Sequence, residues 1–225
     1  MSDCYSKYPK HYVAVDCIIF GLNHGELSLL LAQRTIDPER GKWSLMGGFV
    51  GEDESVYSAA QRVLTELTGL ENIPMEQVGA FGEIDRDPGQ RVISVAYCTL
   101  VNVDQTDSEA LKAHHALWVP LKQLPELGFD HPLMIASAYR WLQKKFMTEP
   151  IAFRLLPESF TLSQLQILCQ TVIDEEIDKR NFRKRVAEIP SIVPTGIIDK
   201  KSSRRGAQLF RFCEKTYQNN PKFKL

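Results

Sequence analysis

Residues 62–70, RVLTELTGL, hold the side chains whose spacing could support metal chemistry. Residues 63, 66 and 67 are three and four positions apart, so a helix would place them on one face. Metal chemistry on such a face needs several carboxylates, because Mg²⁺ and Mn²⁺ bind several oxygen ligands when they activate water. In this chain the three residues are Val63, Glu66 and Leu67. A single carboxylate cannot organise such an ion, so we expect no metal, no cofactor and no catalytic residue here.

The elements around this stretch are predicted from the periodicity of apolar residues and from turn residues. Strands are predicted over 12–20, 26–34, 77–86, 91–103 and 116–121, and helices over 55–70 and 131–146. Two glycines between the first two strands favour a β-hairpin. Mixed strands with a few helices indicate an α+β fold, built as an α/β/α sandwich over residues 1–150.

The remaining residues, 151–225, have a different pattern. The predicted elements are, in order, a linker with one short strand at 147–160, a helix at 161–178, a short basic helix at 179–188, and a strand, basic turn and strand at 192–212. This is the order of a winged helix-turn-helix. We therefore expect two domains, with the boundary near residue 150.

The charge of the chain is divided unevenly. The formal net charge is −1, but residues 151–225 contain 14 Lys and Arg against 8 Asp and Glu, and residues 1–150 contain 13 against 20. A basic third favours a polyanionic partner, although a solvated tail could have the same composition. Arg and Asn can read base edges, and Lys and Ser suit phosphate contacts. The candidate DNA-binding residues are Arg180, Asn181, Arg183, Lys184, Lys200, Lys201, Ser202, Arg204 and Arg205.

Residues 46–70, MGGFVGEDESVYSAAQRVLTELTGL, resemble the Nudix hydrolase box. The matching positions are Gly48, Glu54, Arg62, Leu64, Glu66, Gly69 and Leu70. The resemblance implies a Nudix fold. In active Nudix enzymes three glutamates on one helix face hold a metal against a pyrophosphate, so Val63 and Leu67 imply that this activity is weak or absent. Metal ligands supplied from elsewhere, such as Glu54 or Glu83, remain an alternative.

A Nudix cleft without metal ligands can still bind a polar small molecule. The candidate effector-binding residues are Lys10, Tyr12, Arg34, Trp43, Glu66, Glu83, Asp85 and Arg91. The runs GEIDRDPGQRVISVAY (82–97) and FDH (129–131), and the basic C-terminal third, resemble Nudix-related transcriptional regulators. This resemblance covers residues 8–213. In that family a non-catalytic Nudix-like domain senses a metabolite and controls DNA binding by a winged helix, usually as a dimer.

The resemblance is closest to the arabinose-responsive type of regulator. It implies a homodimeric repressor of a sugar-utilisation pathway that binds operator DNA and takes L-arabinose as its effector. The five widely spaced cysteines, which include no CxxC pair, indicate reduced thiols in a cytoplasmic protein. Three alternatives stay open: a regulator responsive to ADP-ribose or a related NAD metabolite, a metal-dependent Nudix hydrolase with a basic accessory domain, and a catalytically silent scaffold. The sequence has no apolar run near the roughly 20 residues of a membrane span, so no membrane partner is expected.

Overall fold

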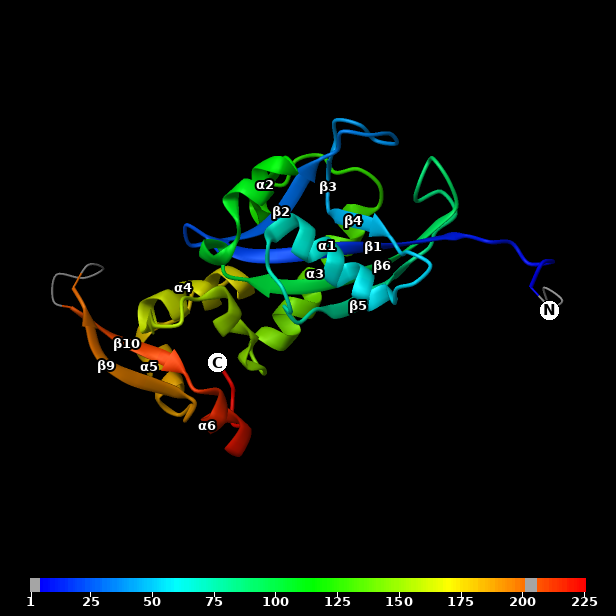
Figure 1. Ribbon diagram of the computed structural model, residues 1–225. Coiled ribbons are helices and arrows are strands. Elements are labelled where there is room, and N and C mark those ends of the chain that lie inside the picture. Colours follow the sequence, from blue (N-terminus) through cyan, green and yellow to red (C-terminus); the bar gives the residue numbers. More distant parts are fainter. Residues whose placement is uncertain (1–4, 201–205) are drawn as a thin grey trace.

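The computed structural model describes residues 5–200 and 206–225, which form a sandwich with a smaller unit at one end (Figure 1). The N-terminal segment extends from the opposite end of the sandwich. Within these ranges no helix is long and apolar enough to cross a membrane. Four candidate DNA-binding residues, Lys201, Ser202, Arg204 and Arg205, lie outside the described residues.

A mixed sheet of seven strands forms the centre of the sandwich. Its strands are β1 (Tyr12–Asn23), β2 (Glu26–Gln33), β3 (Trp43–Ser44), β4 (Met46–Phe49), β5 (Glu76–Phe81), β6 (Val92–Val101) and β7 (Ala116–Pro120). The main path runs β3-β2-β1-β6-β5, while β4 pairs with β1 and β7 pairs with β2. The predicted hairpin is confirmed, because β1 and β2 pair antiparallel with Asn23 opposite Glu26. The long central pair, β1 and β6, is parallel.

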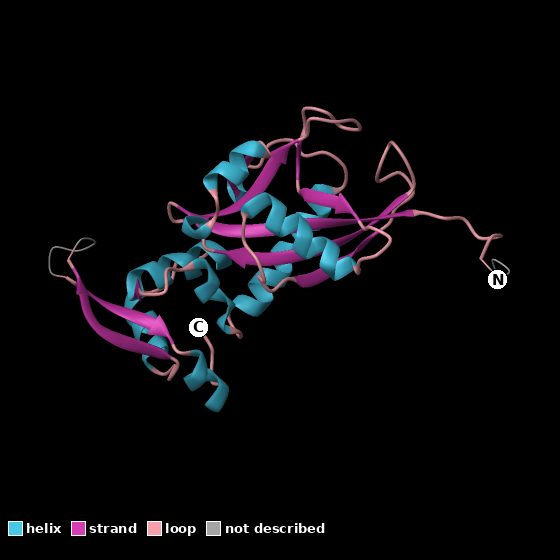
Figure 2. Cartoon of the chain, in the orientation of Figure 1, coloured by secondary structure: helices cyan, strands magenta, loops and turns pink. Residues whose placement is uncertain are grey.

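Two helices cover the two faces of this sheet (Figure 2). Successive side chains of a strand point to opposite faces, so Cys17 of β1 packs in the layer of α1 (Val56–Thr68) and Ile18 packs in the layer of α3 (His131–Phe146). The predicted α/β/α sandwich is therefore confirmed. Two short helices, η1 (Val103–Gln105) and α2 (Ser108–Ala113), lie between β6 and β7, and η2 (Leu121–Gln123) lies between β7 and α3.

The predicted helix over 55–70 is α1, and its ends follow from local chemistry. The Ser55 side chain accepts a hydrogen bond from the backbone N–H of Ser58, which caps the first turn. Gly69 ends the helix with φ 72°, a left-handed conformation that glycine adopts without steric cost. Val63 is only 3% exposed because it packs between the helix and the sheet. The box residues therefore place α1 firmly on one face of the sandwich.

The smaller unit has the predicted order of a winged helix-turn-helix. Its elements are η3 (Pro150–Leu155), β8 (Phe160–Thr161), α4 (Leu162–Ile173), α5 (Lys179–Ala187), β9 (Ile192–Asp199), β10 (Ala207–Phe212) and α6 (Glu214–Asn219). The strands form a second sheet in the order β8-β10-β9. Thr161 and Gln164 form a reciprocal capping box at the start of α4. The helix ends earlier than predicted because Asp174 adopts a left-handed φ of 58°.

Two sequence expectations need correction. The predicted linker at 147–160 contains the buried 3-10 helix η3, whose Ile151 is 5% exposed and belongs to the core. The predicted strand at 77–86 ends at Phe81, and Arg86 turns back into the interior instead. In both segments long-range packing overrides the local pattern.

The sandwich and the winged helix share one continuous apolar core. Phe146 at the end of α3, Leu155 of η3 and Leu165 of α4 belong to the same buried cluster. The Tyr139 hydroxyl of α3 also donates a hydrogen bond to the Val172 carbonyl of α4, at 2.9 Å. The helix α3 therefore connects the Nudix-type sandwich directly to the C-terminal unit.

Candidate small-molecule site and nucleic-acid interface

A cavity of about 510 Å³ opens on the sandwich between β1, β4, the loop after β2 and the start of α3. We call it the sandwich cavity. Its volume is in the range of small-molecule sites, which is roughly 300–1,000 Å³. The lining combines apolar side chains with polar groups from several segments. It therefore has the composition of a small-molecule site.

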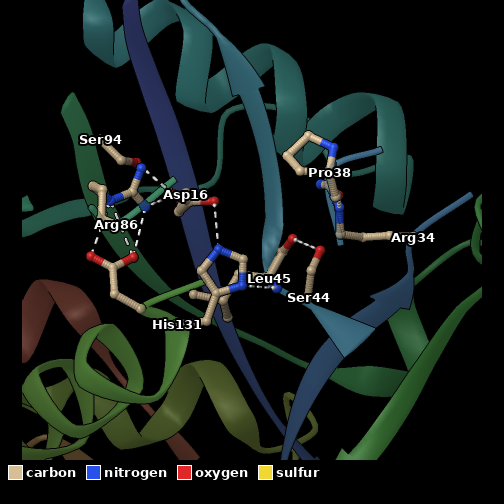
Figure 3. Close-up of polar contacts among 9 residues, drawn as sticks. Asp16, Arg34, Pro38, Ser44, Leu45, Arg86, Ser94 and His131 are labelled. Carbon is tan, nitrogen blue, oxygen red and sulfur yellow. Dashed lines mark hydrogen bonds and ion pairs between the residues drawn. The ribbon is translucent and has the colours of Figure 1, made fainter. Parts of the chain in front are cut away.

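Beside this cavity, the charged side chains of Asp16, Arg86 and Asp130 and the imidazole of His131 form a network, which we call the buried ion cluster. Figure 3 shows Asp16, Arg86 and His131. The Ser94 hydroxyl donates to Asp16 Oδ2 at 2.6 Å, and His131 Nε2 lies 3.4 Å from Asp16 Oδ1. The Leu45 backbone N–H donates to His131 Nδ1 at 3.1 Å. Because Nδ1 accepts, the proton of the neutral ring is on Nε2 and points toward Asp16.

Arg86 connects the other carboxylate of the buried ion cluster. Its guanidinium donates to both Asp130 oxygens, at 2.8 to 3.2 Å, and lies 3.6 Å from Asp16. Burial raises the pKa of Asp16, but hydrogen bonds from His131 and Ser94 and the charge of Arg86 outweigh burial, and the pKa falls below its ordinary value. Asp16 is therefore an ionised, fully partnered carboxylate.

Gly47 of β4 is placed directly opposite Asp16 in the sheet. A Cβ atom at this position would lie 2.5 Å from Asp16 Oδ1 and 2.9 Å from the Val15 carbonyl oxygen. Only glycine leaves room for the carboxylate at this register. Gly47 thus has a structural role of its own, although the glycine that matches the Nudix box is the next residue, Gly48.

Arg34 lies at the wall of the sandwich cavity, on the loop after β2. Its guanidinium carbon is 4.8 Å from the centre of the Phe129 ring, and its Nε donates to the Pro38 carbonyl at 2.8 Å. These contacts fix the plane of the guanidinium. Its two terminal nitrogens have no acceptor among the residues that the structure describes, so they can donate to a ligand.

The structure does not bring the predicted effector-binding residues together. Arg34 lines the sandwich cavity, and the other seven do not: Lys10, Tyr12, Trp43, Glu66, Glu83, Asp85 and Arg91. Trp43 pairs with Gln33 in the sheet and packs on the core. Arg91 donates to the Glu83 carbonyl in the loop between β5 and β6. Their assignment to the effector stays a prediction.

Sequence reasoning missed the buried ion cluster. One signal was present: Asp16 interrupts the apolar strand YVAVDCIIF on the same face as the core residue Ile18. A charge at a core-facing strand position needs partners. Those partners, Arg86 and His131, come from segments 70 or more residues away, so the sequence alone could not identify them.

The carboxylates of the Nudix box form a second, exposed ion cluster of Glu54, Arg62 and Glu66. Arg62 pairs with Glu54 at 2.7 Å and with Glu66 at 3.7 Å. The hydrogen bond from Arg62, followed by that from the Gly51 N–H, lowers the pKa of Glu54. The Glu54 carboxylate is thus already bound by Arg62, and Val63 is in the core. These residues do not fit a divalent metal, and no group of three His, Cys, Asp or Glu in the described ranges could hold one.

The basic helix α5 presents its charged residues to solvent. Arg180, Asn181, Arg183 and Lys184 are all exposed, and Arg185, which was not predicted, is exposed too. The opposite side of the helix is held in the core by Phe182 and Val186, 2% and 3% exposed. Lys200 is exposed at the end of β9. The geometry suits insertion of α5 into a groove with β9 and β10 beside it.

Comparison with known proteins agrees with this architecture. The chain matches the NUDIX domain over residues 10–142 and the NrtR DNA-binding winged helix domain over residues 152–212. It is 33% identical to the ADPR responsive transcriptional repressor NtrR of Acinetobacter baylyi, over 96% of this chain and 87% of that protein.

Solved structures of one relative show the same two-part fold. Shewanella oneidensis NrtR complexed with a 27mer DNA is 28% identical, covers 95% of this chain and 97% of that chain, and has a TM-score of 0.81. The NUDIX domain of that protein complexed with ADP ribose is 28% identical, covers 60% and 90% of the two chains, and has a TM-score of 0.50. The predicted Nudix and winged-helix folds are confirmed.

The arabinose prediction is wrong. The relative that matches nearly the whole chain responds to ADPR, and the related NUDIX domain was solved with ADP ribose. The regulator family was predicted correctly because the box and the winged helix mark the fold. The effector depends on a few cavity residues, and the prediction of a pentose was not based on any of them.

Proposed function

Because this chain belongs to the Nudix-related transcriptional regulators that carry an NrtR-type winged helix, we propose that it is an ADP-ribose-responsive repressor. The observation that carries this proposal is the similarity to an ADPR responsive repressor over 96% of the chain. In the proposal, α5 and the wing bind operator DNA, and ADP-ribose in the sandwich cavity changes the affinity for it. Since a repressor works where the chromosome is, a cytoplasmic location is part of the proposal.

The residues of the sandwich cavity support a ligand of this kind. ADP-ribose carries a diphosphate, and an arginine fork binds phosphate oxygens through paired hydrogen bonds. Arg34 can supply this fork because its Nε and ring contacts hold the guanidinium in place. Arg86 is already paired with Asp130 and Asp16. It therefore holds these two carboxylates in place and adds little net positive charge to the sandwich cavity. Arg34 is therefore the proposed diphosphate ligand.

We also propose that ADP-ribose is bound and not hydrolysed. Val63 is buried, Glu54 is bonded to Arg62, and Glu66 does not line the sandwich cavity. The Nudix box, all of which lies within the described residues, therefore lacks a set of carboxylates that would hold a metal against the diphosphate. Incubation with ADP-ribose and Mg²⁺, followed by chromatography, should leave the ligand intact. Turnover at ordinary enzyme rates would instead favour the hydrolase alternative.

A homodimer is the proposed DNA-binding form. A two-fold symmetric dimer presents two α5 helices, so its operator would be palindromic with half-sites about one helical turn of 34–36 Å apart, or a multiple of it. Analytical ultracentrifugation with a selected duplex should give two chains per duplex. One chain per duplex would contradict this part of the proposal.

The DNA assignment is tested with a duplex that the protein itself selects from a random-sequence pool. Fluorescence anisotropy should show that Arg183→Ala and Lys184→Ala weaken binding, by about 5- to 150-fold for a base-reading arginine. The exposed Lys222, outside the winged-helix strands and α5, provides the matched control: Lys222→Ala should bind as the wild type does. Equal affinity of all four proteins would remove α5 from the interface.

A further inference from the structure

A second cavity, of about 560 Å³, lies between the sandwich and the winged helix. We call it the interdomain cavity. Its walls come from the turn between β1 and β2, from η2, from α3, and from the end of α4 with the turn that follows. Ligand sites occur preferentially at such domain interfaces. This cavity shares no lining residue with the sandwich cavity.

The floor of the interdomain cavity is apolar and carries one aromatic ring. Leu27 and Ile135 are 4% and 5% exposed and belong to the shared core. Tyr139 contributes its ring, which is held in place because its hydroxyl donates to the Val172 carbonyl at 2.9 Å. A tyrosine ring that is held in place beside apolar side chains can pack against the aromatic or aliphatic part of a small molecule.

The rim of the cavity is acidic. Glu26, Asp174, Glu175 and Glu176 line it, and Lys122 is the single cation, so the lining has a formal charge of −3. Lys122 is already paired with Asp174. Burial and then the Asp174 carboxylate raise the pKa of Tyr139. The charge therefore selects against anions.

From this combination we propose that the interdomain cavity is a binding site for a small organic cation with an aromatic or aliphatic body. The body would rest on Leu27 and Ile135, and the cationic group would lie against the Tyr139 ring and the acidic rim, as in cation–π recognition of ammonium groups. The chemistry is opposite to that of a diphosphate ligand. The proposal is thus independent of the function assigned to the sandwich cavity.

Such a ligand would touch both parts of the chain at once. The sandwich and α4 already meet here, because the Thr171 hydroxyl lies 3.3 Å from the Gly25 carbonyl oxygen and the Tyr139 hydroxyl donates to the Val172 carbonyl. A molecule bound between them stabilises this arrangement of the two parts, by an amount that grows with the logarithm of its concentration above the Kd. The site would therefore hold the winged helix in one position relative to the sandwich.

The test uses the full chain and benzyltrimethylammonium as the probe, with benzyl alcohol and benzoate as neutral and anionic comparisons. Isothermal titration should show saturable binding of the cation, weaker binding of the alcohol, and no binding of benzoate. The double variant Glu175→Gln/Glu176→Gln should bind the cation about fivefold more weakly, since both acids are exposed and partly screened. Glu158→Gln, an exposed acid away from the cavity, should bind as the wild type does.

Two further variants give opposite expected results. Lys122→Ala removes the only cation of the lining and should tighten binding of the probe, whereas Ala136→Phe fills the space beside Tyr139 and should abolish it. Both positions are exposed, so melting curves should confirm folded protein. Equal affinity for benzyltrimethylammonium and benzyl alcohol, or unchanged binding in the double glutamine variant, would overturn the proposal. Absence of saturable binding to the wild type would overturn it as well.

Discussion

The sandwich contains two clusters of charged side chains that differ in burial and in origin. The exposed ion cluster follows the spacing of the Nudix box, and its Arg62 and Glu66 side chains are 41% and 55% exposed. The buried ion cluster has no motif spacing, and the Arg86 and Asp16 side chains are 4% and 11% exposed. The recognisable motif therefore marks the fold, while the cluster assembled by tertiary structure borders the candidate ligand site.

The strongest test of this difference is Asp16→Ala. It leaves His131 Nε2 without its carboxylate and Arg86 with a single acidic partner in a buried place. Breaking such a buried network should lower the free energy of unfolding by about 3–5 kcal/mol. Urea denaturation followed by circular dichroism measures this loss. A loss below about 1 kcal/mol would mean that the buried ion cluster is no more important than one ordinary hydrogen bond.

Acidification should weaken the same cluster by a smaller amount. The pKa of Asp16 in the folded chain is below its ordinary value of 3.8. The carboxylate therefore contributes stability above pH 3.8, and this contribution is lost as the pH falls through the lower, folded pKa. Urea midpoints measured from pH 6 downward should fall more steeply for the wild type than for Asp16→Asn. Parallel curves for the two proteins would contradict the assignment.

Gly47→Ala should have an intermediate effect. The new Cβ would lie 2.5 Å from Asp16 Oδ1, so the carboxylate or the strand must move. Overpacking of this kind costs about 1–3 kcal/mol. Gly82→Ala is the matched control, because its Cβ would meet Ile93 at an ordinary 3.6 Å. Equal melting temperatures of the two alanine variants would contradict the claim that Gly47 is needed to make room for the Asp16 carboxylate.

Glu66→Gln should have the smallest effect. Glu66 makes one long ion pair at the surface and does not line the sandwich cavity. Its substitution should change the free energy of unfolding by less than about 0.5 kcal/mol, with ADP-ribose affinity unchanged. Urea denaturation checks the change in the free energy of unfolding, and calorimetric titration checks the ADP-ribose affinity. Loss of ADP-ribose binding would restore Glu66 as a pocket carboxylate, as the sequence had suggested.

The fold was predictable where local chemistry and packing agree. The predicted helix at 131–146 coincides with α3, because apolar periodicity and Pro132 in the first turn mark it clearly. The helix at 55–70 is bounded by Ser55 and Gly69, which act as its caps. The segment at 147–160 was harder to predict, because two prolines suggest a linker while Ile151 is drawn into the core.

The site was less predictable because its parts are far apart in the sequence. Of the eight predicted effector residues only Arg34 lines the sandwich cavity. Glu83 and Asp85 belonged to the predicted strand at 77–86, but β5 stops at Phe81 and both residues lie in the loop that follows. Arg91 directly precedes β6 and does not line the cavity either. Arg86, in the same loop, is the one that turns inward. Which residue of this loop turns inward therefore depends on the path of the loop, which the local sequence pattern does not reveal.

The most direct test of the central claim is operator affinity measured with and without ADP-ribose, in the wild type and in Arg34→Ala. In the wild type ADP-ribose should change operator affinity by about 5- to 150-fold, the usual range of coupling between two sites. Arg34→Ala should bind the operator normally and lose this response, and Arg34→Lys should lose part of it because an ammonium cannot form the paired contacts. A full response of Arg34→Ala at the wild-type ADP-ribose concentration would contradict the assignment of the sandwich cavity.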